Sequence, residues 1–214
     1  MKHLISIDQY NYQTLHTLFE KVAKEEYGFI ETSYSKKGQI ATLFYEPSTR
    51  TSASFHSAAT QLGYSVLPIN EVTYSSVTKG ETLEDTIKTI GSYVDLIVLR
   101  HGEKGASKRA ASVSQVPIIN AGDGIGEHPT QTLLDLYTIW KEKSRIDGLN
   151  ITLMGDLKNG RTIHSLIKIL RLFNVHINLI SPSSLKLPNE YLKHSDHEST
   201  QFLPYASTTD VLYV

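Results

Sequence analysis

The sequence predicts an α/β protein with two parallel-sheet domains, the second of them incomplete. Apolar runs of strand length alternate with segments of helical spacing along most of the 214 residues. One charged stretch that contains a helix breaker, KEKSRIDG at 141–148, interrupts this alternation. We therefore expect one domain over residues 1–142 and another over residues 149–214.

The first domain is expected to contain four strands separated by helices. The apolar runs that predict strands lie at 38–46, 64–69, 94–100 and 116–122. Helical spacing marks 13–26, 48–62, 83–90 and 104–115, and Pro129 stands at the first position of a further helix that reaches Trp140. Residues 70–80 are polar and lack periodicity, so we expect a loop there.

The second domain begins with a strand at 149–156, a helix over 161–173 and a strand at 175–181. Residues 181–204 contain prolines and serines with little periodicity, which predicts irregular structure. The final segment, TTDVLYV, is expected to be a buried strand. A core strand without continuation suggests that the chain lacks a C-terminal part.

The composition excludes several classes of function. The 21 basic and 22 acidic side chains give a formal net charge of −1, so no basic field is expected to hold nucleic acid or an anionic membrane. Cysteine is absent, which excludes disulfides, thiolate metal sites and a cysteine nucleophile. The first ten residues, MKHLISIDQY, lack the apolar core of a signal peptide, so we expect a cytoplasmic protein, or one delivered elsewhere by a presequence not present here.

Polar groups that suit anions or carbonyls follow four of the expected strands. In an open parallel sheet, ligands bind beyond the carboxyl ends of the strands. The segments at these ends are PSTRT at 47–51, Arg100 with His101, DGIGEHPTQ at 123–131, and DLKNGR at 156–161. Polar residues scattered at random over a protein surface would not place such groups at each strand end in turn.

The segment FYEPSTRTSASF at 44–55 places hydroxyl groups and Arg50 at a helix start. The free N–H groups of a helix N-terminus, its dipole and an arginine fork together form an anion site. Helix capping is the alternative, but it explains one hydroxyl, that of Ser48, rather than the whole set.

Arg100 and His128 are ambiguous when each is taken alone. Arg100 is either a surface arginine at a strand terminus or a ligand-binding group. His128 is either a helix-entry residue before Pro129 or a neutral donor to a polarised carbonyl, with Gln131 one turn inside the helix.

The segment GDLKNGRT at 155–162 is one residue away from the phosphate-binding G-x-x-x-x-G-K-[ST] pattern. Arg161 replaces the lysine that contacts phosphates, and no clear metal-binding strand follows. Nucleotide binding is therefore a minor alternative, and Arg161 suits a carboxylate just as well.

Five segments in order resemble the aspartate/ornithine carbamoyltransferase family: FYEPSTRTSASF, SSVTKGETLEDT, IVLRH, INAGDGIGEHPTQTLLDLYTI and MGDLKNGRTIHSL. The first segment and HPTQ are shared with the ornithine branch, whereas SVTKGE and GDLKNGRTIHS are similar to the aspartate branch. The resemblance implies transfer of the carbamoyl group of carbamoyl phosphate to L-aspartate, in pyrimidine synthesis. It also implies that residues 1–142 bind carbamoyl phosphate and that residues 149–214 are a truncated aspartate-binding domain.

The resemblance also assigns roles to individual residues. The positions that would hold the phosphate are Ser48, Thr49, Arg50 and Thr51. Arg100 would bridge phosphate and carbonyl oxygen, and Thr51, Arg100 and His128 would polarise that carbonyl. Gln131 would bind the carbamoyl NH2 group. No metal or other cofactor is implied.

The remaining implied roles concern aspartate and assembly. Arg161 would bind a carboxylate of aspartate, and Ser75 and Lys79 would reach into the neighbouring subunit's site of a homotrimer. A regulatory or fused partner is possible in such a family. Two alternatives stay open: a non-catalytic fragment that binds carbamoyl phosphate or forms trimers, and a related carbamoyltransferase with another amine acceptor.

Overall fold

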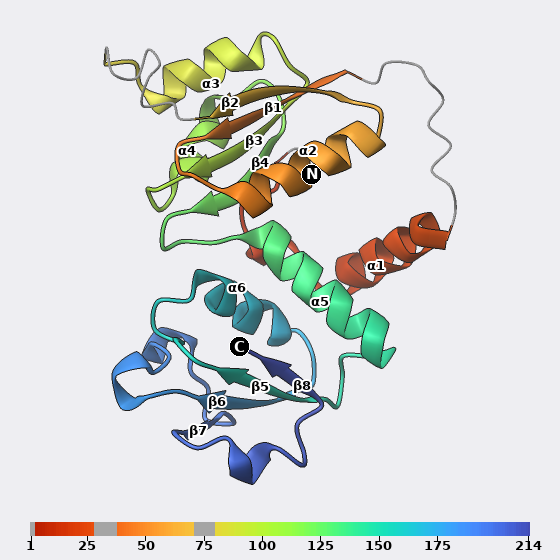
Figure 1. The fold of residues 1–214 in the computed structure, drawn as a ribbon, viewed down its shortest axis with the longest axis vertical. Coiled ribbons are helices and arrows are strands. Elements are labelled where there is room, and N and C mark those ends of the chain that lie inside the picture. Colours follow the sequence, from red (N-terminus) through yellow and green to blue (C-terminus); the bar gives the residue numbers. More distant parts are fainter. Residues whose placement is uncertain (1–2, 28–37, 71–79) are drawn as a thin grey trace. The chain divides into compact units, whose positions relative to one another are not determined.

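The computed structural model describes residues 3–27, 38–70 and 80–214. Contacts divide the chain into two compact units, whose helices and strands are labelled in Figure 1. One comprises Met1–Gln9 and Leu18–Pro129, and the other comprises Tyr10–Thr17 and Thr130–Val214. The division falls at the start of helix α5 (Pro129–Lys143), whereas the boundary expected from sequence follows that helix.

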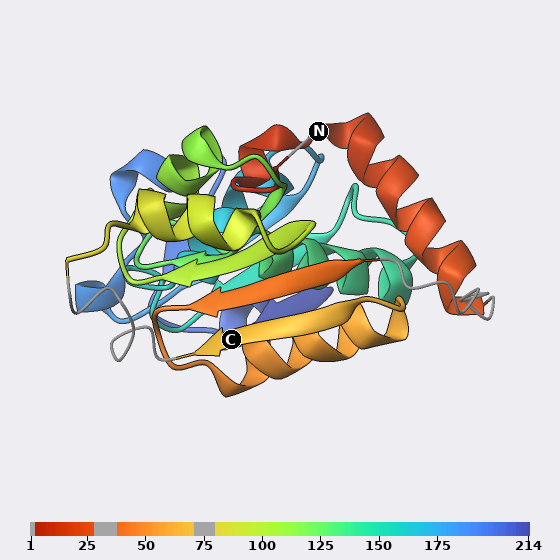
Figure 2. The same ribbon diagram turned by 90° about the horizontal axis from the view of Figure 1, so that it is seen from above.

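The first unit contains a parallel sheet with strand order β2-β1-β3-β4 among its described residues. The strands are β1 (Gln39–Phe44), β2 (Ser65–Asn70), β3 (Leu96–His101) and β4 (Ile118–Asp123). The helices are α2 (Thr49–Gln61), α3 (Leu83–Gly91) and α4 (Ala106–Val113), with η1 (Ile7–Gln9) near the N-terminus. Helix α1 (Tyr12–Tyr27) is divided between the units after Thr17. Figure 2 shows α2 on one face of the sheet and α3 and α4 on the other.

Both faces of this sheet are buried. Successive side chains of a strand point to opposite sides, so neighbouring residues pack in different clusters. Leu43 and Leu99 pack in the cluster that includes residues of α3 and α4. Their neighbours Phe44 and Val98 pack in the cluster that includes Phe55 of α2. This two-sided burial is why the strands appear in the sequence as continuous apolar runs.

The second unit contains another parallel sheet, with strand order β7-β6-β5-β8. Its elements are β5 (Asn150–Met154), α6 (Arg161–Leu170), β6 (His176–Ile180), β7 (His197–Ser199) and β8 (Val211–Tyr213), with turns of 3-10 helix η4 (Ser183–Leu185), η5 (Asn189–Tyr191) and η6 (Leu203–Tyr205). The predicted class, α/β with two parallel sheets, is therefore confirmed.

Two expectations for the second unit are wrong in detail. The segment TTDVLYV is not a buried strand: β8 lies at an edge of the described sheet, pairs there with β5, and leaves Leu212 45% exposed. The segment 181–204 is not wholly irregular, because β7 pairs in parallel with β6. Backbone hydrogen bonds form β7, and its exposed His197 and Glu198 give no apolar signal.

A buried ion pair organises the segment that precedes β7. The guanidinium of Arg171, just after α6, donates to both carboxylate oxygens of Asp196, whose side chain is only 1% exposed. Arg171 also donates to the carbonyl of Tyr191 at 3.1 Å. Lys186 and Glu198 form a second pair nearby, but those side chains are 51% and 33% exposed.

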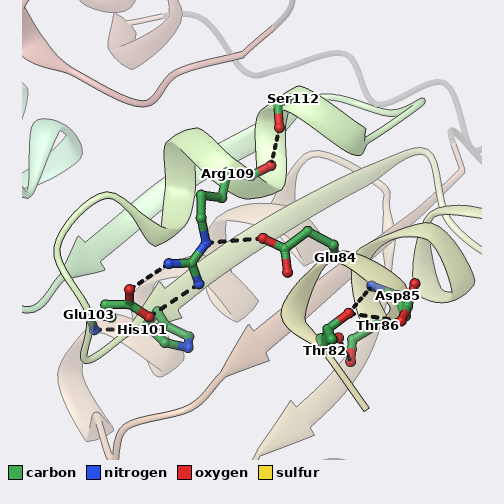
Figure 3. A network of polar contacts seen from close by, with 8 residues as sticks. All are labelled: Thr82, Glu84, Asp85, Thr86, His101, Glu103, Arg109 and Ser112. Carbon is green, nitrogen blue, oxygen red and sulfur yellow. Dashed lines mark hydrogen bonds and ion pairs between the residues drawn. The ribbon is translucent and has the colours of Figure 1, made fainter.

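A polar network joins the elements beside the end of β3 (Figure 3). Arg109 of α4 donates to Glu84 of α3 at 3.0 Å and binds both carboxylate oxygens of Glu103. The backbone N–H of Glu103 donates to Nδ1 of His101 at 3.0 Å. Burial lowers the pKa of His101, although the nearby carboxylate of Glu103 opposes this. The network contacts the ring of His101, which follows the candidate ligand-binding residue Arg100 in the chain.

No helix within residues 3–27, 38–70 and 80–214 has the length and apolar character needed to cross a membrane.

The buried ion pair predicts a contrast between two substitutions. Asp196→Asn should lower the free energy of unfolding by about 3 kcal/mol, because it leaves the guanidinium of Arg171 without its carboxylate. Glu198→Gln, at the exposed pair, should cost under about 1 kcal/mol. Urea unfolding of both variants checks this, and equal losses would contradict it.

The lowered pKa of His101 predicts a pH effect on stability. Below the ordinary histidine pKa, the unfolded chain binds a proton that the folded chain resists, so the folded state loses stability as the pH falls. His101→Gln removes this loss. Between about pH 7.5 and about pH 5.5, the wild type should lose more unfolding free energy than the variant. Parallel losses would show that His101 does not contribute.

Candidate functional site

The carboxyl ends of β1, β3 and β4 meet at one edge of the first sheet. Phe44 is the register partner of Arg100, and His101 is the partner of Asp123. Backbone bonds continue past the strands: Tyr45 N donates to the carbonyl of Arg100 at 2.9 Å, and Gly124 N donates to that of His101 at 2.8 Å. The segments that follow these three strands therefore start side by side.

The start of α2 presents a set of hydroxyls and a guanidinium. Ser48 is the N-cap with an extended backbone, but its side chain makes no capping hydrogen bond. Four consecutive side chains make no hydrogen bond with another described residue, namely those of Ser48, Thr49, Arg50 and Thr51. The Ser48 side chain therefore does not cap the helix, and the hydrogen-bond donors of this segment remain available to an anion.

Arg100 is held inside the first unit rather than exposed at a strand end. Its side chain is 12% exposed, with Nε 3.5 Å from a carboxylate oxygen of Glu46. One terminal nitrogen donates to the carbonyl of Ala121 on β4 at 3.4 Å. These contacts fix the guanidinium between the ends of β1 and β4. The surface-arginine interpretation does not fit this burial.

The loop between β4 and α5 is fixed from both sides. One carboxylate oxygen of Asp123 accepts from Glu127 N at 2.7 Å, and the other accepts from Gly105 N at 3.0 Å. The carboxylate of Glu127 accepts from Ile7 N at 2.8 Å. These contacts set the position of His128, which follows at 6% exposure.

A close approach of two loops explains one glycine in this region. Gly124 has φ +58, and a Cβ there would lie 2.2 Å from the carbonyl oxygen of Gly102. The loops after β3 and β4 can therefore touch only if this residue is glycine. Asp123 and Glu127 stand in the polar segment DGIGEHPTQ, but sequence reasoning assigned neither a role of its own, because two carboxylates spaced around glycines are common in turns.

The second unit contains Gln131, in the first turn of α5. Its side-chain nitrogen Nε2 donates to Oδ1 of Asp135 at 2.9 Å, and the hydroxyl of Tyr213 on β8 donates to Oδ2 at 3.0 Å. Burial raises the pKa of Asp135, and the bonds from Gln131 and Tyr213 oppose this. Sequence reasoning missed Asp135 and Tyr213. The i, i+4 spacing of Gln131 and Asp135 on a helix was an available signal for the first.

The loop before α6 does not suit a nucleotide phosphate. The carboxylate of Asp156 accepts from the backbone N–H groups of Lys158 and Asn159 at 3.2 and 3.0 Å. The hydrogen bonds from the Asn159 side chain, together with these backbone bonds, lower the pKa of Asp156. A phosphate would have to displace this carboxylate from the loop amides. Arg161 follows as the first residue of α6.

Two of the candidate residues, Ser75 and Lys79, lie outside the described residues. Within the described ranges, no group of three or more His, Asp or Glu side chains could hold a metal ion. The phosphate and carbonyl candidates lie in the first unit, whereas Gln131 and Arg161 belong to the second.

Comparison with known proteins extends these observations. Residues 2–141 match the family model described as aspartate/ornithine carbamoyltransferase, carbamoyl-P binding domain. The whole chain is 47% identical to part of the multifunctional protein pyr1-3 of Dictyostelium discoideum, and it spans 10% of that protein's length.

Two solved structures are also similar. The catalytic subunit of aspartate transcarbamoylase from M. jannaschii has 44% identity and a TM-score of 0.93, over 100% of this chain and 73% of that chain. The Trypanosoma cruzi aspartate transcarbamoylase in complex with carbamoyl phosphate and aspartate has 38% identity and a TM-score of 0.90, over 99% and 71%. By sequence and by fold, this chain belongs to the aspartate/ornithine carbamoyltransferase family.

Proposed function

We propose that this chain performs the chemistry of an aspartate carbamoyltransferase, making N-carbamoyl-L-aspartate from carbamoyl phosphate and L-aspartate in pyrimidine synthesis. The observation that carries the proposal is the meeting of the start of α2, Arg100 and the loop before His128 at one sheet edge. The solved relative from Trypanosoma cruzi with both substrates supports the choice of ligands.

The start of α2 is proposed to hold the phosphate. The helix N-terminus offers N–H groups and a favourable dipole, and Arg50 adds a fork that matches two phosphate oxygens. The hydroxyls of Ser48, Thr49 and Thr51 supply further donors. Residues 1–142 would thus be the carbamoyl phosphate-binding domain, and residues 149–214 part of the aspartate-binding domain.

The carbonyl is proposed to face Thr51, Arg100 and His128. The amino nitrogen of aspartate attacks the carbonyl carbon, a C–N bond forms, the C–O bond to phosphate breaks, and the nitrogen gives up a proton. Negative charge develops on the carbonyl oxygen during this step. Each preorganised donor to that oxygen is typically worth about 3 kcal/mol of barrier. The contacts of Arg100 with Glu46 and Ala121 provide such preorganisation for one of the donors.

The finer roles extend the proposal to aspartate and assembly. Gln131 would accept a hydrogen bond from the carbamoyl NH2 group, and Arg161 would bind a carboxylate of aspartate. Ser75 and Lys79 would act in the neighbouring subunit's site of a homotrimer. A cytoplasmic location and a regulatory or fused partner remain predictions.

A second candidate is binding of carbamoyl phosphate without turnover. The family model that matches residues 2–141 is specifically that of the carbamoyl phosphate-binding domain, and the chain spans 73% and 71% of the two solved relatives. In this case the phosphate and carbonyl contacts would operate as above, but no carbamoyl aspartate would form.

Arg50→Ala should weaken binding of carbamoyl phosphate by at least about tenfold, because a charge-assisted bond to phosphate is lost. Arg145→Ala removes another exposed arginine, in the connection before β5, and serves as the matched control. Isothermal titration calorimetry of both variants measures the effect. Equal affinities would place the phosphate elsewhere.

Turnover separates the two candidates. The purified chain of 214 residues should form carbamoyl aspartate from carbamoyl phosphate and aspartate, and the product can be followed by a colorimetric ureido assay. Arg100→Lys should reduce the rate more than it reduces phosphate binding, because the fork donates to the carbonyl oxygen that gains charge. Binding without any product would favour the second candidate.

A further inference from the structure

We propose that Asp135 is a positioning residue. It orients the amide of Gln131 so that the amide oxygen faces the carbamoyl NH2 group, and this orientation lets the site select carbamoyl phosphate over acetyl phosphate. The inference rests on the proposed function, because it takes Gln131 as the residue that meets this NH2 group. It concerns a carboxylate for which the proposed chemistry gives no direct role.

The geometry leaves one orientation of the amide. Gln131 and Asp135 are four residues apart on α5, and Nε2 of Gln131 lies 2.9 Å from Oδ1 of Asp135. A carboxylate can only accept hydrogen bonds, so it binds the NH2 end of the amide and rejects the oxygen end. With Nε2 committed to Asp135, Oε1 is the end that remains for a ligand.

Asp135 is itself held in place. The hydroxyl of Tyr213 on β8 donates to Oδ2 at 3.0 Å, so each carboxylate oxygen has its own donor. The side chain is also half-buried. Buried polar groups with satisfied partners are restricted in orientation, so the amide they contact is restricted as well.

The orientation has a chemical consequence. The carbamoyl group carries NH2, which donates, where acetyl phosphate carries a methyl group of similar size, which cannot. An acceptor fixed in the site therefore favours carbamoyl phosphate and is left unpaired by acetyl phosphate. An amide turned the other way would present NH2 to NH2 and lose this preference.

The test compares the affinities of carbamoyl phosphate, acetyl phosphate and inorganic phosphate for the whole chain. Wild type should prefer carbamoyl over acetyl phosphate by about tenfold. In Asp135→Asn, the hydroxyl of Tyr213 should retain the side-chain oxygen, so the new NH2 turns toward Gln131 and flips its amide. The preference should fall to near unity, while the affinity for inorganic phosphate should stay unchanged.

The double variant Asp135→Asn with Tyr213→Phe distinguishes orientation from simple damage. Without the tyrosine hydroxyl, the asparagine oxygen is free to accept from Gln131, so the preference should partly return. Asp147→Asn is the matched control, because Asp147 also accepts from a tyrosine hydroxyl, that of Tyr12 at 3.1 Å. If Asp135→Asn does not fold, Asp135→Ser takes its place, because it also removes the carboxylate that holds the amide.

The outcomes separate the inference from the proposed function. An unchanged preference in a folded Asp135 variant would overturn the role of Asp135 while leaving carbamoyl phosphate binding intact. A wild type that binds inorganic phosphate but shows no preference would also overturn it. Failure of the wild type to bind carbamoyl phosphate would overturn the proposed function together with the inference.

Discussion

The parallel register of β1, β3 and β4 is the constraint on which the candidate site depends. Because the strands run in one direction, the three segments that follow them start from the same sheet edge. The register is fixed by burial on both faces, since a slip by one residue would exchange the side chains that pack against α2 with those that pack against α3 and α4. Core packing thereby determines where Arg100 lies relative to the start of α2.

Fixed loops then turn this alignment into a preorganised set of donors. Asp123 and Glu127 bind backbone N–H groups on both sides of the loop that leads to His128. Arg100 is held by Glu46 and a carbonyl of β4. Donors that are already oriented cost little reorganisation when charge develops on a substrate oxygen, which is how such sites accelerate acyl transfer. The side chains at the start of α2, by contrast, make no hydrogen bond with another described residue.

Much of the fold could be predicted from the sequence, because buried parallel strands give continuous apolar runs such as 94–100. The anion-binding character of 48–51 was also visible, since several hydroxyls and an arginine at a helix start have few structural uses. The strand β7 could not be predicted, because backbone pairing with β6 forms it. The partnership of Asp135 with Tyr213 was equally hidden, since it joins residues far apart in the sequence.

A crystal structure of this chain with carbamoyl phosphate tests the proposed site most directly. We expect the phosphate at the N-terminus of α2, bound by Arg50 and its neighbouring hydroxyls. We also expect the carbonyl oxygen within hydrogen-bond distance of Arg100 and His128. Phosphate bound at the loop 155–160 instead, or a carbonyl oxygen that contacts neither residue, would contradict the proposed site.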